Sequence, residues 1–105
     1  MNTLEDKKAE NIVLLDLQGH SVFTDYFIIC TGTSERQLDA LVDALDETAH
    51  KKHRRKAPKI EGRAAGGWVL VDFGEVIVHL FSAEKRRYYR LEELWPEGKV
   101  VLQIQ

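Results

Sequence analysis

Gly32, Thr33 and Ser34 stand between an aromatic and β-branched run at residues 26–31 and an amphipathic segment. Ser34, with Gln37 three positions later, forms the capping-box pattern of a helix N-terminus. The free N–H groups and positive dipole end of such a helix attract anions, so one interpretation is a phosphate site. The other is an ordinary strand-to-helix cap. A single glycine falls short of a phosphate-loop fingerprint, which favours the cap.

A nucleotidyltransferase needs, besides a Gly-Ser pair, two carboxylates at alternate positions of a strand to hold magnesium. At the corresponding spacing the chain carries Asp43 and Asp46, three residues apart on the polar face of a predicted helix. That spacing cannot present two inward ligands as a strand does. Asp72 and Glu75 lie on either side of a predicted turn. The metal-binding half of this motif is therefore missing, and we predict no nucleotide transfer.

Other combinations of reactive side chains are also incomplete. Asp72 and His79 fall on adjacent predicted strands and could form a general base with its orienting group, but the sequence places no nucleophile beside them. Cys30 has no cationic neighbour in sequence that would activate its thiol. His50 and His53 sit among cations that would repel a divalent ion. We therefore expect no catalytic residue, no cofactor and no metal site.

Size and composition narrow the class of protein. With 105 residues, of which 44% are hydrophobic and 30% charged, the chain is expected to form one globular domain, residues 1–105. A net charge of -2 gives no general attraction to nucleic acid, and a single cysteine excludes an internal disulfide. No run approaches the ~20 apolar residues of a membrane span, and no signal peptide is visible. We expect a cytoplasmic protein without membrane contact.

Five runs have the length and residue types of strands: 12–17, 26–31, 68–73, 76–81 and 100–104. The close spacing of the first two favours an antiparallel pair around a turn at 18–20, and the last run is expected at a sheet edge. A two-residue connection through Gly74 and Glu75 predicts a tight hairpin between the third and fourth. Residues 61–67, with three glycines, are expected to form a loop.

Helical periodicity is strongest from Glu35 onward, where apolar residues recur on one face: Leu38, Leu41, Val42, Leu45 and Ala49. This pattern predicts an amphipathic helix that ends before Pro58. Residues 4–10 are interpreted as the last turns of a short helix. Residues 85–89 are expected to form a turn or short helix, and residues 91–95 a helical turn.

Five of the chain's 15 basic residues cluster at the end of the predicted long helix: Lys51, Lys52, Arg54, Arg55 and Lys56. One interpretation is an auxiliary contact with RNA phosphates. The other is a solvated helix end whose cations complement the dipole. The cluster lacks the interleaved aromatic residues of a base-reading surface, so we expect no sequence specificity from it.

The predicted hairpin has two unlike faces. One is wholly apolar and should pack against helices: Val69, Val71, Phe73, Val76, Val78 and Leu80. The other mixes large apolar groups with an acid and an imidazole: Trp68, Leu70, Asp72, Ile77, His79 and Phe81. Such a mixture is typical of a binding face, although a second layer such as the C-terminal segment could also cover it. We predict partner binding by Trp68, Leu70, Asp72, His79 and Phe81, with Tyr88 and Leu91 at the rim.

Four segments in order resemble the Iojap family, the ribosomal silencing factors. They are FTDYFII leading into TGTSERQ at 23–37, Glu61 with Gly62, WVLVDFG at 68–74 leading into VHLF at 78–81, and RYYRLEELW at 87–95. The resemblance implies an α/β fold: a single compact domain with a mixed β-sheet packed against helices, nucleotidyltransferase-like without the catalytic carboxylates. Glu75 stands where an aspartate is more usual in the family.

The resemblance also implies a function. Family members bind the large ribosomal subunit through its protein numbered fourteen and obstruct the bridge to the small subunit, which slows translation when nutrients are short. Organelle relatives act in large-subunit assembly. We therefore expect a non-enzymatic translation repressor; the alternatives are a nucleotidyltransferase-like enzyme, an assembly factor and a small RNA-binding module. The apolar face further predicts a two-fold homodimer when no ribosome is present.

Overall fold

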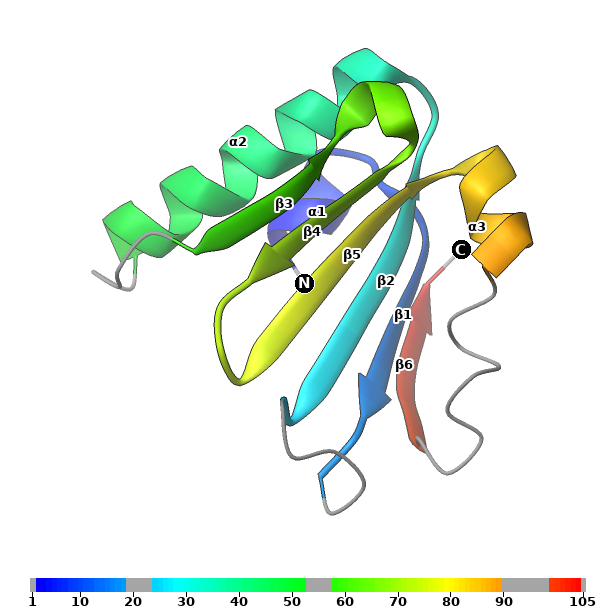
Figure 1. Cartoon of the computed structure of the whole chain (residues 1–105). Coiled ribbons are helices and arrows are strands. Elements are labelled where there is room, and N and C mark those ends of the chain that lie inside the picture. Colours follow the sequence, from blue (N-terminus) through cyan, green and yellow to red (C-terminus); the bar gives the residue numbers. More distant parts are fainter. Residues whose placement is uncertain (1, 19–23, 53–57, 90–98, 105) are drawn as a thin grey trace.

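The computed structural model describes residues 2–18, 24–52, 58–89 and 99–104, which form one six-stranded sheet with helices (Figure 1). The elements in chain order are α1 (Asn2–Asp6), β1 (Glu10–Asp16), β2 (Tyr26–Gly32), α2 (Glu35–Lys52), β3 (Lys59–Arg63), a 3₁₀ turn (Ala64–Gly66), β4 (Trp68–Asp72), β5 (Val76–Ser82), α3 (Ala83–Tyr89) and β6 (Lys99–Ile104). No helix within the described ranges is both long and apolar enough to cross a membrane.

The sheet is mixed, with strand order β3-β4-β5-β2-β1-β6. The central pair β2 and β5 runs parallel, with Cys30 opposite Leu80, and every other neighbouring pair is antiparallel. The parallel pair requires a crossover, which α2, β3 and β4 supply. The predicted α/β class and the single mixed sheet packed against helices are therefore confirmed.

Each face of the sheet carries its own apolar cluster, because side chains alternate along every strand. On one face the leucines of α2 and Leu4 of α1 cover a first cluster: Ile28, Cys30, Val69, Val71, Val78 and Leu80 belong to it. A second cluster occupies the opposite face: Val13, Leu15, Leu17, Phe27, Ile29 and Phe81. Helix α2 lies across the first face in Figure 1. Strand β2 is thus buried on both sides, which explains its continuous apolar sequence.

The tight hairpin is confirmed. The Phe73 N–H donates to the Val76 carbonyl at 2.9 Å, which leaves only Gly74 and Glu75 in the connection. Gly74 adopts φ 95°, a left-handed conformation that favours glycine at this turn. The predicted strand at 26–31, the amphipathic helix α2 and the last strand at the sheet edge are also confirmed.

The prediction of a loop at 61–67 was wrong. Lys59–Arg63 forms the edge strand β3, antiparallel to β4, and a 3₁₀ turn follows it. Gly62 lies inside this strand at φ 88°, where a Cβ atom would stand 2.3 Å from the Trp68 carbonyl oxygen. The glycine therefore permits a close approach of two backbones, whereas the sequence pattern attributed it to a loop.

The N-terminal elements are shifted relative to the prediction. Helix α1 ends at Asp6, because Lys8 at φ 62° turns the chain before β1 begins at Glu10. The predicted turn at 18–20 lies largely outside the described residues, and the predicted helical turn at 91–95 lies wholly outside them. The short helix expected at 85–89 is present as α3, which starts at Ala83.

Candidate functional site

The segment that enters β2 is fastened to the β4–β5 hairpin at one carbonyl group. The Glu75 oxygen accepts hydrogen bonds from the Asp25 N–H at 3.0 Å, the Tyr26 N–H at 3.1 Å and the Thr24 hydroxyl at 2.8 Å. Thr24 is buried, so its hydroxyl needs this partner. In the sequence Thr24 belongs to a family-like motif, and its place two residues before an aromatic strand is the signal for this structural role.

The residues that could have formed a phosphate loop build a helix cap instead. The Ser34 hydroxyl accepts a hydrogen bond from the Gln37 N–H at 3.0 Å, as the capping pattern predicts. The Gln37 side chain accepts from the Thr33 N–H and donates to the carbonyls of Lys7 and Lys8. These bonds tie the start of α2 to the end of α1, which supports the structural interpretation of the motif.

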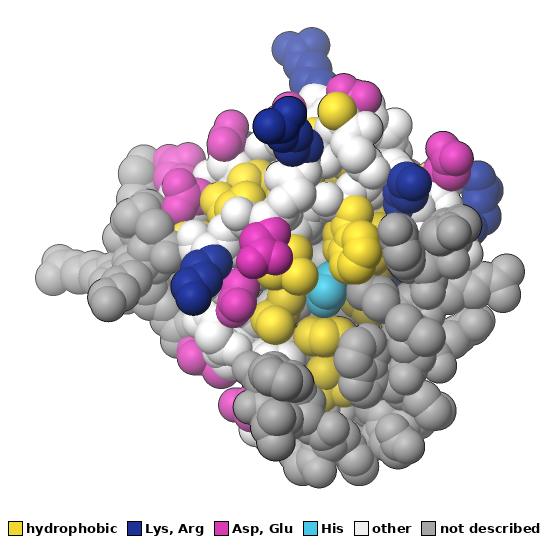
Figure 2. All heavy atoms as spheres, in the orientation of Figure 1, with side chains coloured by type: hydrophobic (Ala, Val, Ile, Leu, Met, Phe, Trp, Pro, Cys, Tyr) yellow, Lys and Arg dark blue, Asp and Glu magenta, His cyan; other side chains and the backbone are white. Residues whose placement is uncertain are grey.

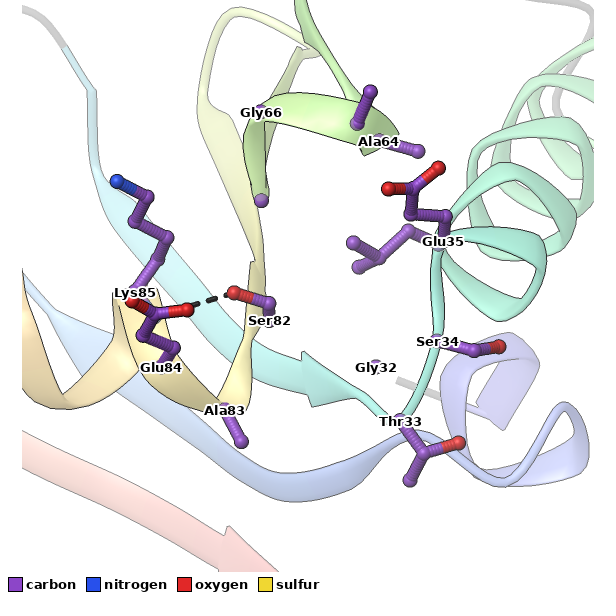
Figure 3. Close-up of a pocket in the computed structure, with 13 residues that line it drawn as sticks. Gly32, Thr33, Ser34, Glu35, Ala64, Gly66, Ser82, Ala83, Glu84 and Lys85 are labelled. Carbon is purple, nitrogen blue, oxygen red and sulfur yellow. Dashed lines mark hydrogen bonds between the residues drawn. The ribbon is translucent and has the colours of Figure 1, made fainter.

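A pocket of about 220 Å³ opens where the parallel strands β2 and β5 end, between α2, the 3₁₀ turn and α3 (Figure 3). This edge of an α/β sheet is where such folds commonly place ligands. The charged residues that line it are Glu35, Glu84 and Lys85. Two carboxylates against one ammonium group oppose a phosphate ligand. Among the described residues, no three acidic, histidine or cysteine side chains gather to hold a metal ion.

Asp72 and His79 do not meet as a catalytic pair. Asp72 is opposite Ile77 in the hairpin ladder, and one of its carboxylate oxygens accepts the Gly74 N–H at 2.7 Å. His79 is opposite Leu70, and its Nδ1 accepts a hydrogen bond from the Trp68 indole N–H at 3.3 Å. Asp72 thus stabilises the turn, while His79 orients the Trp68 indole ring.

Burial determines the protonation of His79. The side chain is 4% exposed, and this burial lowers the pKa of His79 from 6.5 to about 4, so the imidazole is neutral at pH 7. Because Nδ1 accepts from Trp68, the proton resides on Nε2. Nε2 is buried and has no hydrogen-bond partner among the described residues. Burial also raises the pKa of the Cys30 thiol to about 12, which leaves it unreactive.

Four rings gather on the face of the sheet opposite α2 and form what we call the aromatic cluster: Phe27, Trp68, His79 and Phe81. The Trp68 and Phe81 rings stack with centroids 5.1 Å apart, and Phe27 meets His79 edge-on at 4.6 Å. In Figure 2, hydrophobic side chains surround a histidine near the middle of the visible face. These contacts and the hydrogen bond to His79 hold the indole in one orientation.

The predicted partner residues lie at two depths. Trp68, Leu70 and Asp72 alternate along β4 and are half-buried, so part of each is open to a partner. His79 and Phe81 lie beside them on β5, opposite Leu70 and Trp68, and are buried, with Phe81 0% exposed. Phe81 is therefore a core residue on which Trp68 stacks from the neighbouring strand, and the hairpin pattern alone did not indicate its depth. Tyr88 belongs to α3, without a described side chain, and Leu91 lies outside the described residues.

The basic cluster is only partly described. The backbone of Lys51 and Lys52 forms the end of α2, and residues 53–57 lie outside the described ranges, so Arg54, Arg55 and Lys56 are not placed. An RNA contact by this cluster remains a prediction.

Comparison with known proteins decides the family. The whole chain, residues 1–105, matches the family model described as "Ribosomal silencing factor during starvation". The chain belongs to this family. It is 40% identical over 101 residues to the ribosomal silencing factor of Halalkalibacterium halodurans, an alignment that covers 96% of this chain and 86% of the relative.

Two further matches extend this ribosomal silencing factor assignment. A crystal structure of a Chromobacterium violaceum protein superimposes with a TM-score of 0.82 at 36% identity, covering 90% of this chain and 78% of the other. A mouse protein named "Mitochondrial assembly of ribosomal large subunit protein 1" is 38% identical over 90% of this chain and 42% of its own length. Membership of the ribosomal silencing factor family implies ribosome-associated regulation of translation, and the relatives' names describe regulators rather than enzymes.

Proposed function

We propose that this protein binds the large ribosomal subunit through the ribosomal protein numbered fourteen and sterically blocks joining of the small subunit. Translation would then slow when nutrients are limited, and the protein would act in the cytoplasm. Its family supports a ribosomal partner. Steric exclusion needs only occupancy of a surface, so this function requires no catalytic group, cofactor or metal ion.

One observation carries the choice of contact surface. Trp68, Leu70 and Asp72, which we call the anchor surface, are half-buried side chains on one face of β4. The Trp68 ring is already fixed by its stacking on Phe81 and its bond to His79. A large aromatic side chain held in one orientation loses little entropy on binding, which is typical of interface hot spots. Tyr88 and Leu91 are proposed as the rim.

Sedimentation with separated ribosomal subunits tests this proposal. We expect the protein to sediment with isolated large subunits, and not with small subunits or with joined ribosomes, in which the proposed contact is occupied. An interface of standard size buries roughly 1,600 Å² of surface in total, which supports nanomolar affinity when a few anchor side chains are well packed. Equal binding to both subunits, or none to the large one, would refute the proposal.

A role in assembly of the large subunit is a second candidate, and the name of the mouse relative favours it. The two roles differ in timing. An assembly factor is needed during growth with abundant nutrients, so cells lacking the gene would then accumulate incomplete large subunits in a sucrose gradient. A repressor alone would leave that gradient unchanged and alter it only under starvation.

Two auxiliary contacts complete the proposal. Lys51, Lys52, Arg54 and Arg55 would add an electrostatic contact with ribosomal RNA, which predicts that affinity falls as salt concentration rises. In the absence of ribosomes, two copies would pair through their anchor surfaces, because self-association is the simplest way to cover an apolar patch.

A further inference from the structure

A second hollow, of about 200 Å³, lies beside the anchor surface, between the edge strand β3 and β4. Glu61, Gly62, Trp68 and Leu70 line it. It is separate from the pocket at the ends of the parallel strands, with which it shares no lining residue. Glu61 and Leu70 face each other across the ladder, which places an exposed carboxylate next to an aliphatic and an aromatic side chain.

Gly62 forms one wall of the hollow. At φ 88°, with the Trp68 carbonyl oxygen 2.3 Å from any Cβ, this position excludes every other residue without strain. Among the described residues, β3 is the edge strand of the sheet on this side, with no strand paired beyond it. Every residue of β3 is exposed. The hollow is thus open to a partner that approaches the anchor surface.

The lining of the hollow suits a basic side chain. Arginine and lysine combine an aliphatic stem, which packs on apolar surface, with a cation that is attracted to carboxylates and to aromatic rings. Leu70 and Trp68 provide the apolar and aromatic walls, and Glu61 provides the carboxylate. Among the described residues, the Glu61 carboxylate has no hydrogen-bond or ion-pair partner, while its backbone pairs with Leu70 in the ladder.

Neighbouring charges restrict what can enter. Lys59 and Arg63 flank Glu61 two positions away on the same face of β3, opposite Asp72 and Trp68 respectively. The face of the strand therefore alternates positive, negative, positive. A cation placed at Glu61 is attracted, whereas a cation shifted by two residues along the strand, to Lys59 or Arg63, meets a like charge. This alternation favours one basic side chain in one register over a general basic surface.

We propose that the hollow formed by Glu61, Gly62, Trp68 and Leu70 receives one basic side chain from the protein partner. The proposal rests on the proposed function, which it deepens by naming the chemistry of a contact. It assigns a role to Glu61 and Gly62. Trp68 would then act both as a wall of this hollow and as the centre of the anchor surface.

A titration without ribosomes tests the hollow directly. In a Trp95→Phe background, Trp68 is the only tryptophan, and its fluorescence reports occupancy. We expect N-acetylarginine amide to produce a saturable change with a Kd on the order of millimolar. N-acetylcitrulline amide, which has a similar shape without the guanidinium charge, should produce none, and Glu61→Gln should abolish the response to N-acetylarginine amide. Equal responses to both amides, or an unchanged response in Glu61→Gln, would overturn the proposal.

Subunit binding by charge variants provides the second arm. Glu61→Gln should weaken large-subunit binding roughly fivefold to tenfold, and Glu61→Lys more strongly, since a reversed charge repels the incoming cation. Asp39→Lys, the matched control on the exposed side of α2, should bind like the unaltered protein. Unchanged binding by Glu61→Lys, while the unaltered protein binds, overturns this inference alone. Failure of the unaltered protein to bind refutes the proposed function, and the amide titration still decides the hollow.

Discussion

Trp68 and Phe81 stack on one another, yet their different burial assigns them different roles. Trp68 is half-buried and Phe81 is 0% exposed. We predict that Trp68→Ala weakens large-subunit binding by ~2 kcal/mol or more, about thirtyfold, because it removes the exposed anchor. Phe81→Ala should instead lower the free energy of unfolding by ~3 to 5 kcal/mol, because it opens a cavity in the core.

Thermal melting and large-subunit binding, measured on both variants, separate these roles. The expected pattern is lost binding with a retained fold for Trp68→Ala, and a large fall in melting temperature for Phe81→Ala. If Trp68→Ala unfolds the protein to the same extent as Phe81→Ala, the anchor interpretation fails and both rings belong to the core.

His79 makes stability depend on pH with a definite sign. The folded state lowers the pKa of His79 from its ordinary value of 6.5 to about 4, so the unfolded chain takes up a proton first as pH falls. The contribution of His79 to the free energy of unfolding is therefore full above about pH 6.5. It decreases as pH falls from about 6.5 to about 4, by roughly 3 kcal/mol in total.

The free energy of unfolding in urea, measured from pH 7 to pH 4, tests this dependence. His79→Gln serves as the comparison, because its side chain does not titrate while the carboxylates of the chain titrate in both proteins. As pH falls, the free energy of unfolding should decrease more for the unaltered protein than for His79→Gln. Parallel curves would show that His79 does not carry the dependence.

At the scale of elements, local patterns predicted well those segments whose structure is determined locally. Strand β2 has a continuous apolar and β-branched run, helix α2 has a strong period of 3.6, and the β4–β5 hairpin is specified by a two-residue turn with Gly74. Strand β3 was missed because its glycine serves a contact with Trp68, a residue six positions later on another strand. The burial of Phe81 was missed because Leu15 and Ile29, on other strands, complete its surroundings.

The glycines around β3 provide a test of this element. We predict that Gly62→Ala destabilises the fold markedly, because an added Cβ would stand 2.3 Å from the Trp68 carbonyl oxygen at a φ of 88°. Gly66→Ala is the matched control, since a Cβ there meets nothing within 4 Å. Urea unfolding should give a loss of ~2 kcal/mol or more for Gly62→Ala and a small change for Gly66→Ala. Equal effects would contradict the strand geometry.

At the scale of the whole molecule, the family resemblance implied a mixed sheet, which local patterns do not specify. The parallel pairing of β2 with β5 joins segments about 50 residues apart, and no periodicity specifies such a partner. The sequence placed Trp68, Leu70 and Asp72 on one face of the hairpin, as the structure confirms. It could not determine how deep each side chain lies, because depth depends on the side chains that β1 and β2 contribute to the same face.

Self-association is the first prediction at this scale. If the anchor surface is covered by a second copy when ribosomes are absent, light-scattering mass should approach twice that of the chain as concentration rises. Trp68→Ala should shift this equilibrium toward the monomer, and Asp39→Lys should not. A mass that stays monomeric at high concentration would remove the dimer from the proposal.

Subunit joining in the presence of this protein tests the central claim most directly. Purified large subunits are first incubated with increasing amounts of the protein and are then mixed with small subunits. Light scattering follows the formation of joined ribosomes. We predict that the protein reduces joining in proportion to large-subunit occupancy, and that Trp68→Ala, shown by its melting curve to be folded, restores joining. Joining that proceeds undiminished on large subunits saturated with the protein would contradict steric exclusion.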